Sequence, residues 1–152
     1  MTGDKTTKGG ARSAARLAAV QALYQIEASG SKNLIVAKEF VDHRFGEIVD
    51  DERLEAADAA FFSDVVTGTG KRADEIDNAI ASNLSKGWTL ERIESVARAV
   101  LRAGAYEIIA RPDVPTSVII NEYVDVTKAF FDDSTPGFVN GVLDKIAKLT
   151  RE

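Results

Sequence analysis

The stretch Val114-Pro-Thr-Ser-Val-Ile-Ile-Asn-Glu-Tyr-Val-Asp-Val-Thr-Lys-Ala-Phe-Phe131 decides the fold, because its apolar residues recur with a helical period. At about 100° per residue, they fall on one arc of a helix about 160° wide, which exceeds the stripe of a surface helix. The members of that arc are Ile119, Ile120, Tyr123, Val124, Val126, Thr127, Phe130 and Phe131. This helix is therefore expected to touch several neighbours. Pro115 is expected at its first helical position, where the missing N–H costs nothing.

A second helical pattern follows in Thr135-Pro-Gly-Phe-Val-Asn-Gly-Val-Leu-Asp-Lys-Ile-Ala-Lys-Leu149. One face of this helix would hold Phe138, Val139, Val142, Leu143, Ile146 and Leu149. Thr135 is expected to cap the helix, with Pro136 as its first residue. Residues 132–136 then form a tight turn, and the two helices return against each other as a hairpin.

The rest of the chain is also patterned for helices, which are expected over residues 11–28, 33–48, 54–66, 72–84 and 90–110. Gly68 and Gly70 leave two possibilities for the helix over residues 54–66. It either ends at these glycines or continues, kinked, into the helix over residues 72–84. Thr89 with Glu91 signals the start of the helix expected over residues 90–110. Within it, Gly104 is expected to let another helix approach closely. Since no strand pattern appears, the expected fold class is all-α, with six or seven helices.

Composition places the chain among ordinary globular proteins, with 152 residues, 45% apolar and 28% charged. Cysteine is absent, which excludes a disulfide framework, a thiolate zinc site and a cysteine nucleophile. Residues 1–10 lack apolar side chains after Met1, so we expect a flexible basic tail followed by a single helical domain over residues 11–152. Neither a secretory signal nor a membrane span is visible, and a cytoplasmic protein is expected.

Positive charge is concentrated at the N-terminus of a chain whose net charge is −5. Residues 1–16 hold Lys5, Lys8, Arg12 and Arg16 against one acid, Asp4, so they carry +3 and the remainder carries −8. Arg12 and Arg16 are four residues apart and are expected on one side of an exposed helix start, with Lys8 one turn earlier. Guanidinium groups contact phosphates and stack on splayed bases. This cluster is either a site for single-stranded RNA or a solvated group of charges.

Catalytic chemistry has little support in the sequence. The only histidine, His43, has no visible partner and is expected at the surface. Pairs of Glu-x-x-His for a metal centre and glycine-rich phosphate loops are both missing from the sequence. Glu107, Glu122 and Asp125 are expected to have no catalytic or metal-binding role. The sequence therefore predicts a protein that is not an enzyme and needs no cofactor.

Three short blocks follow one another in the second half of the chain: Leu101-Arg-Ala-Gly-Ala-Tyr-Glu107, Ile120-Asn-Glu122 and Phe138-Val-Asn-Gly-Val-Leu-Asp-Lys145. Together they resemble the C-terminal half of the NusB family of bacterial transcription antitermination factors. Ala19-Val-Gln-Ala-Leu-Tyr24, with two arginines before it, is similar to the opening helix of that family. The resemblance implies two small helical subdomains packed together. It also implies an adaptor that binds boxA-like RNA with the ribosomal protein NusE and promotes antitermination complex assembly on RNA polymerase during ribosomal RNA transcription.

The same resemblance implies roles for individual residues. It places Lys8, Arg12 and Arg16 in contact with RNA. Phe138 is either a core residue or an aromatic contact to RNA, and Tyr24 is either a core aromatic or part of the surface shared with NusE. Apart from the resemblance, the Ser134-Thr135 turn next to Phe138 offers hydroxyls and free helix-end N–H groups for a phosphate, although Asp132 and Asp133 oppose it.

Two alternatives differ from this RNA-binding interpretation. A NusB-like domain also precedes the catalytic domain of some ribosomal RNA cytosine methyltransferases, but this sequence has neither a cysteine nucleophile nor a cofactor-binding α/β unit. The other alternative is a helical interaction module or homodimer without an RNA role.

Overall fold

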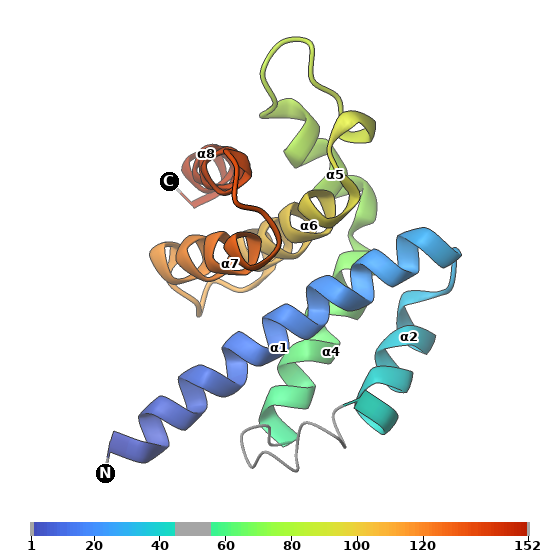
Figure 1. Ribbon diagram of the computed structural model, residues 1–152, viewed down its shortest axis with the longest axis vertical. Coiled ribbons are helices and arrows are strands. Elements are labelled where there is room, and N and C mark those ends of the chain that lie inside the picture. Colours follow the sequence, from blue (N-terminus) through green and yellow to red (C-terminus); the bar gives the residue numbers. More distant parts are fainter. Residues whose placement is uncertain (1, 45–55, 152) are drawn as a thin grey trace. The chain divides into compact units, whose positions relative to one another are not determined.

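The computed structural model describes residues 2–44 and 56–151, and its side chains from residue 10 to 43 and from 59 to 151. It contains two compact units, Met1–Gly70 and Lys71–Glu152. Seven α-helices occur in the described residues, together with one π-helix and one 3-10 helix (Figure 1). The prediction of an all-α fold with six or seven helices is confirmed. No helix in these two described stretches has the length and apolar character needed to cross a membrane.

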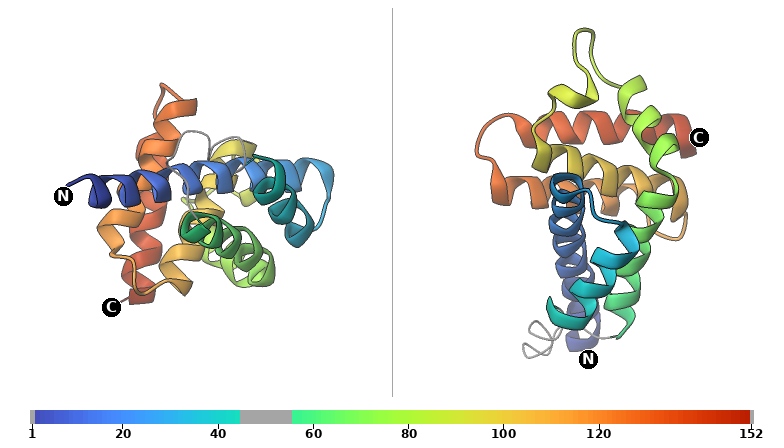
Figure 2. Two further views of the ribbon diagram at one scale, coloured as in Figure 1. Left: turned by 90° about the horizontal axis from the view of Figure 1, so that it is seen from below. Right: turned by 90° about the vertical axis from the view of Figure 1, so that its right-hand side faces the viewer.

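Unit 1 is built on the long helix α1 (Thr2–Ser29), beside which α2 (Asn33–Glu39) folds back (Figure 2). The π-helix η1 (Phe40–Arg44) continues α2, and α4 (Ala56–Lys71) completes the unit. Small buried side chains of α1 allow close packing: Ala11, Ala15, Ala18, Ala19 and Ala22. The rings of Phe40 and Phe62 stack at 5.5 Å between η1 and α4. The predicted second helix is thus confirmed as far as residue 44, and its end lies outside the described residues.

The N-terminal segment of α1 includes residues 2–10, the segment predicted to be a flexible tail. Its backbone is helical in the structure. Its mobility, and the assignment of residues 11–152 to a single domain, stay predictions.

The glycines of α4 do not end that helix. It continues through Gly68 and Gly70 to Lys71, and α5 (Ala73–Ser82) begins after Arg72. Asn33 explains Gly70, because its Nδ2 donates to the Val66 carbonyl at 2.9 Å and a Cβ on Gly70 would lie 2.7 Å from the Asn33 Cγ. The helix bounds answer the open question about a break, because α4 runs through both glycines and is interrupted at Arg72, before α5.

Unit 2 is organised around α6 (Ser95–Ala110), which contacts α5, α7 (Thr116–Phe130) and α8 (Thr135–Arg151) (Figure 1). Most of α6 is buried from Ala97 to Ile108. A Cβ on Gly104 would lie 2.9 Å from Leu143 Cδ1 and 3.4 Å from Tyr123 Cδ2. The predicted close approach at Gly104 is confirmed, and it involves both neighbouring helices.

The predicted start of α6 is wrong. Residues Leu90–Arg92 form the separate 3-10 helix η2, Ile93 is extended, and Glu94 caps α6. The Glu94 Oε1 accepts hydrogen bonds from the Val96 N–H at 2.7 Å and the Ala97 N–H at 3.3 Å. This carboxylate satisfies helix-end donors, whereas the Thr89 side chain makes no capping hydrogen bond, so the α-helix begins at Ser95 and not at Leu90.

Other helix ends and two side chains also differ from expectation. Pro115 precedes α7 in an extended conformation, and Thr135 is the first residue of α8 instead of its cap. Phe130 and Leu149, both predicted to face inward, are 45% and 75% exposed. Each lies in the last turn of its helix, where the helical period persists but the covering neighbours end.

Polar groups hold the C-terminal end of α6 in place. The Arg151 guanidinium donates to the carbonyl oxygens of Glu107, Ile108, Arg111 and Val114 at 2.7 to 3.2 Å. It is therefore a second donor to the Glu107 and Arg111 carbonyls, which also accept the backbone N–H groups of Arg111 and Val114, and it places a cation at the negative end of the helix dipole. In the interior, the Tyr123 hydroxyl donates to the fully buried Glu107 carboxylate. The burial of Glu107 is therefore explained by its hydrogen bond to Tyr123 in the interior of unit 2.

Replacing Gly104 with alanine should lower the free energy of unfolding by about 1–3 kcal/mol, because the new methyl group must displace Leu143 from a packed interface. Gly141→Ala is the matched control, since nothing lies within 4 Å of its Cβ position and alanine gains about 0.5–1 kcal/mol over glycine in a helix. Urea denaturation measures both. Equal effects of the two changes would contradict the close approach at Gly104.

Candidate functional site

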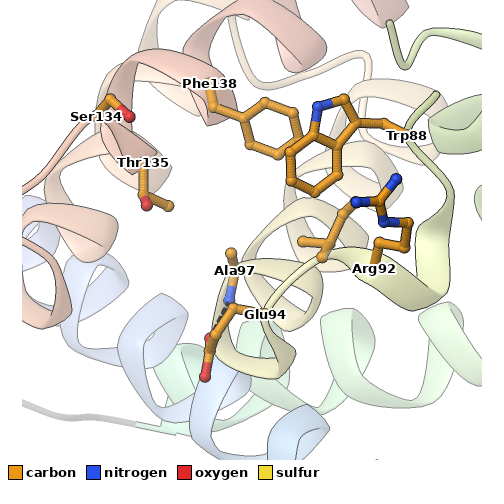
Figure 3. Close-up of a pocket in the computed structure, with 8 residues that line it drawn as sticks. Trp88, Arg92, Glu94, Ala97, Ser134, Thr135 and Phe138 are labelled. Carbon is orange, nitrogen blue, oxygen red and sulfur yellow. Dashed lines mark hydrogen bonds between the residues drawn. The ribbon is translucent and has the colours of Figure 1, made fainter. Parts of the chain in front are cut away.

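A cavity of about 300 Å³ opens in unit 2 where η2 and the start of α6 face the start of α8. Its lining consists of Trp88, Arg92, Ile93, Glu94, Ala97, Ser134, Thr135 and Phe138 (Figure 3). Two of these residues, Ser134 and Phe138, were predicted from the sequence as RNA contacts. The structure thus brings both into one pocket, together with residues that sequence reasoning did not single out.

One wall of the pocket is aromatic. The rings of Trp88 and Phe138 lie with centroids 6.0 Å apart at an interplanar angle of 41° (Figure 3). Trp88 is 47% exposed and Phe138 is half-buried. Phe138 therefore packs against a neighbour and still borders the pocket, so it is not a fully buried core residue. An exposed tryptophan is a strong candidate for ligand contact, because its large apolar surface gains most from being covered.

Arg92 holds the tryptophan in place. Its guanidinium lies 5.2 Å from the Trp88 ring and donates to the Gly87 carbonyl at 2.6 Å. Gly87 has φ +88°, a conformation that L side chains rarely adopt. A cation–π contact and a backbone hydrogen bond thus orient the indole at the mouth of the pocket.

The remaining rim is polar and includes a fixed negative charge. The Glu94 carboxylate caps α6, and Ser134 and Thr135 add hydroxyls from α8. The Thr135 N–H donates to Asp133 Oδ1 at 2.8 Å, so the expectation that this helix-end N–H is free for a phosphate is wrong. Hydrogen bonds from the hydroxyl and then the N–H of Thr135 lower the pKa of the Asp133 carboxyl. Asp133 is therefore ionised beside the position where a phosphate was expected.

In unit 1, the two predicted arginines share one aromatic ring. The guanidinium carbons of Arg12 and Arg16 lie 4.5 Å and 4.9 Å from the Phe61 centroid. Arg12 is half-buried, whereas Arg16 is only 3% exposed. The expectation of two exposed arginines is wrong for Arg16, because its apolar stem and its cation are both used in packing. The side chain of Lys8 lies outside the described residues.

Two other predicted residues are located by their exposure. Tyr24 is 44% exposed near the end of α1, which favours a surface contact over a core position. His43 is exposed, as expected. Whether Lys8, Arg12, Arg16, Ser134, Phe138 and Tyr24 contact RNA or a partner stays a prediction.

Comparison with known proteins gives a consistent result. The model of the NusB family matches residues 13–148. Transcription antitermination proteins NusB from Sphingopyxis alaskensis and Caulobacter vibrioides are 53% and 52% identical over 141 residues, which cover 93% of this chain and 95% of each relative. The structure of T. maritima NusB has a TM-score of 0.74 and 30% identity over 90% of both chains. A crystal structure of antitermination factors NusB and NusE in complex with dsRNA has a TM-score of 0.71 and 26% identity, over 95% of this chain and 98% of that one.

Arg16→Ala should lower the free energy of unfolding by about 2–3 kcal/mol, because it removes a buried stem and leaves a cavity over Phe61. Arg12→Ala, at a more exposed position over the same ring, should cost less than about 1 kcal/mol. Urea denaturation of the two single variants checks this ranking. If the two changes were equally mild, the burial of Arg16 would be contradicted.

Proposed function

The chain belongs to the NusB family, and we propose that it is a non-enzymatic adaptor that binds boxA-like single-stranded RNA together with NusE. It acts in the cytoplasm, in an antitermination complex on RNA polymerase during ribosomal RNA transcription. A NusB of similar fold occurs in a crystal structure with NusE and dsRNA. That relative supports RNA and NusE as partners, and the open aromatic pocket of unit 2 supports a preference for a single strand.

The observation that carries the proposal is the aromatic pair of Trp88 and Phe138 in an open pocket. Proteins that bind single strands stack bases on aromatic rings, and each stacked base contributes about 1–3 kcal/mol. A base paired within a duplex has its faces covered by its neighbours, so such a pocket suits an unpaired base.

We assign the contacts to the sugar-phosphate backbone of the RNA to unit 1. Arg12 is half-buried over Phe61, which supports its guanidinium while leaving part of it accessible. Lys8 extends the same helix towards the N-terminus. Arg16 supports this surface from within, because it is buried. Cations on α1 then supply affinity, and the pocket in unit 2 supplies contacts to a base.

The exposed Tyr24 supports a NusE contact on unit 1. The net charge of −5 adds a long-range attraction for a basic ribosomal protein. The role needs no bound cofactor.

Arg12→Ala should weaken binding to a boxA-like strand at all salt concentrations and should reduce the slope of log K against log salt by roughly 0.7, the value for one lost phosphate contact. Lys148→Ala is the control, because Lys148 is an exposed cation paired with Asp144 at 3.1 Å on α8. Fluorescence anisotropy at several salt concentrations measures both slopes. An unchanged slope in the Arg12 variant would remove α1 from the RNA site.

Phe138→Ala should cost about 1–3 kcal/mol of RNA affinity through lost stacking. The loss of stability should stay below the ~3–5 kcal/mol expected for a fully buried phenylalanine, because Phe138 is only half-buried. Titration with RNA, with and without NusE, and urea denaturation separate the two effects. A variant that is destabilised but binds RNA as tightly as the parent would show that Phe138 is a packing residue only.

A further inference from the structure

The loop that carries Trp88 has little apolar packing of its own. Residues 85–89 are all exposed, and in the segment that follows Leu90 is half-buried and Ile93 is buried. A segment with few buried apolar contacts opens easily unless other contacts hold it. Polar contacts therefore contribute much of what keeps Trp88 at the pocket.

Arg98 of α6 makes such contacts. Its Nη1 donates to the carbonyl oxygens of Ile93 at 2.6 Å and Leu90 at 3.1 Å and, more weakly, to that of Glu91 at 3.5 Å. These carbonyls belong to η2 and to the extended residue after it, so one guanidinium from α6 holds the whole turn. Hydrogen bonds from a charged donor are stronger than those from a neutral one.

The turn that Arg98 holds also carries the side chain that orients Trp88. Arg92 lies within η2, and its guanidinium contacts the Trp88 ring and donates to the Gly87 carbonyl. Arg98 thus fixes the backbone of η2, and Arg92 fixes the indole to η2. Of these two arginines, Arg92 lines the pocket, whereas Arg98 acts from behind the turn.

The place of Arg98 in its helix favours a role in the loop. Arg98 lies in the first turn of α6, where a cation is unfavourable because the helix N-terminus carries a partial positive charge. The carbonyl oxygens of η2 offset this effect by surrounding the cation with acceptors. An arginine here therefore stabilises η2 at the expense of the dipole of its own helix.

We propose that Arg98 is a positioning residue for RNA binding: it holds η2 against the start of α6 and so keeps Trp88 in place to stack on an unpaired base. This inference rests on the proposed function and adds to it a residue that acts without touching RNA. Without Arg98 the loop adopts other arrangements, and the apparent dissociation constant rises as the competent fraction falls. A competent fraction of about one tenth weakens binding about tenfold.

The test compares two arginines that lie one turn apart on α6. Arg98→Met keeps a long side chain and removes the donors. Arg102→Met removes the same charge and also breaks a contact between elements, since Arg102 Nε donates to Asp77 Oδ1 of α5 at 2.9 Å. Both arginines are half-buried. The two variants are therefore matched in charge, burial and helix, and only one of them releases η2.

Trp88 is the only tryptophan in the chain, so the anisotropy of its emission reports the mobility of the loop. Arg98→Met should lower this anisotropy and weaken binding of a fluorescently labelled boxA-like strand about tenfold. The slope of log K against log salt should not change, because the lost donors bind carbonyls and not phosphates. Arg98→Lys, which retains a cation with donors, should recover part of both losses. Arg102→Met should leave anisotropy and affinity unchanged, even where it lowers the melting temperature.

A double-mutant cycle tests whether Arg98 acts through Trp88. Trp88→Ala should weaken RNA binding at least as much as Arg98→Met does. In the Trp88→Ala background, Arg98→Met should then add nothing, because no indole is left to position. Two independent effects that multiply would overturn the inference.

The remaining outcomes separate this inference from the proposed function. Parent-like affinity in Arg98→Met, or equal weakening by Arg102→Met, would overturn the positioning role and leave RNA binding standing. A salt slope smaller by about 0.7 with unchanged Trp88 anisotropy would make Arg98 a phosphate contact instead. If Arg98→Met does not fold, Arg98→Lys carries the test, since parent-like anisotropy and affinity in that variant would also overturn the inference. Failure of the parent chain to bind the strand, with and without NusE, would refute the proposed function itself.

Discussion

The burial of α6 is the constraint on which the rest of unit 2 depends. A helix that is covered along most of its length must satisfy its polar groups within the protein, because water does not reach them. Three side chains meet this requirement. Glu94 accepts from the first N–H groups, the Tyr123 hydroxyl donates to Glu107 in the middle, and Arg151 donates to the carbonyls at the end. Gly104 lets Leu143 of α8 and Tyr123 of α7 approach α6 closely.

The same constraint creates the pocket. Because α6 is capped by Glu94 and not by a residue of η2, the chain from Gly87 to Ile93 is left outside the helix. There it carries Trp88 and Arg92 to the side of Phe138. The architecture thus separates two requirements of RNA binding. In the proposed function, cations on α1 attract phosphates without regard to sequence, whereas the aromatic pocket of unit 2 contacts a base.

The helical period predicted most of the fold, because burial on one face repeats every 3.6 residues wherever two helices pack. It failed at the start of α6, where the sequence marks Thr89 as the cap and the structure uses Glu94, a residue type that is not a preferred N-cap. Arg16 was predicted to be exposed because it is charged. The sequence does not show that its side chain packs on Phe61 and is buried. Trp88 lies between helices, so the helical period gives no information about its position. Its contact with Phe138 depends on how α8 packs against α6, which the sequence does not show. The signal that was available is its setting, a lone tryptophan directly after a glycine in a polar loop.

The central claim is that RNA meets this chain at the cationic face of α1 and at the aromatic pocket of unit 2. Photochemical crosslinking with a boxA-like strand that carries 4-thiouridine, followed by mass spectrometry of the crosslinked peptides, tests it most directly. The account predicts crosslinks at Trp88 or Phe138 and a second group within residues 8–16. Crosslinks confined to other surfaces, such as α2 or the C-terminal half of α8, would contradict it.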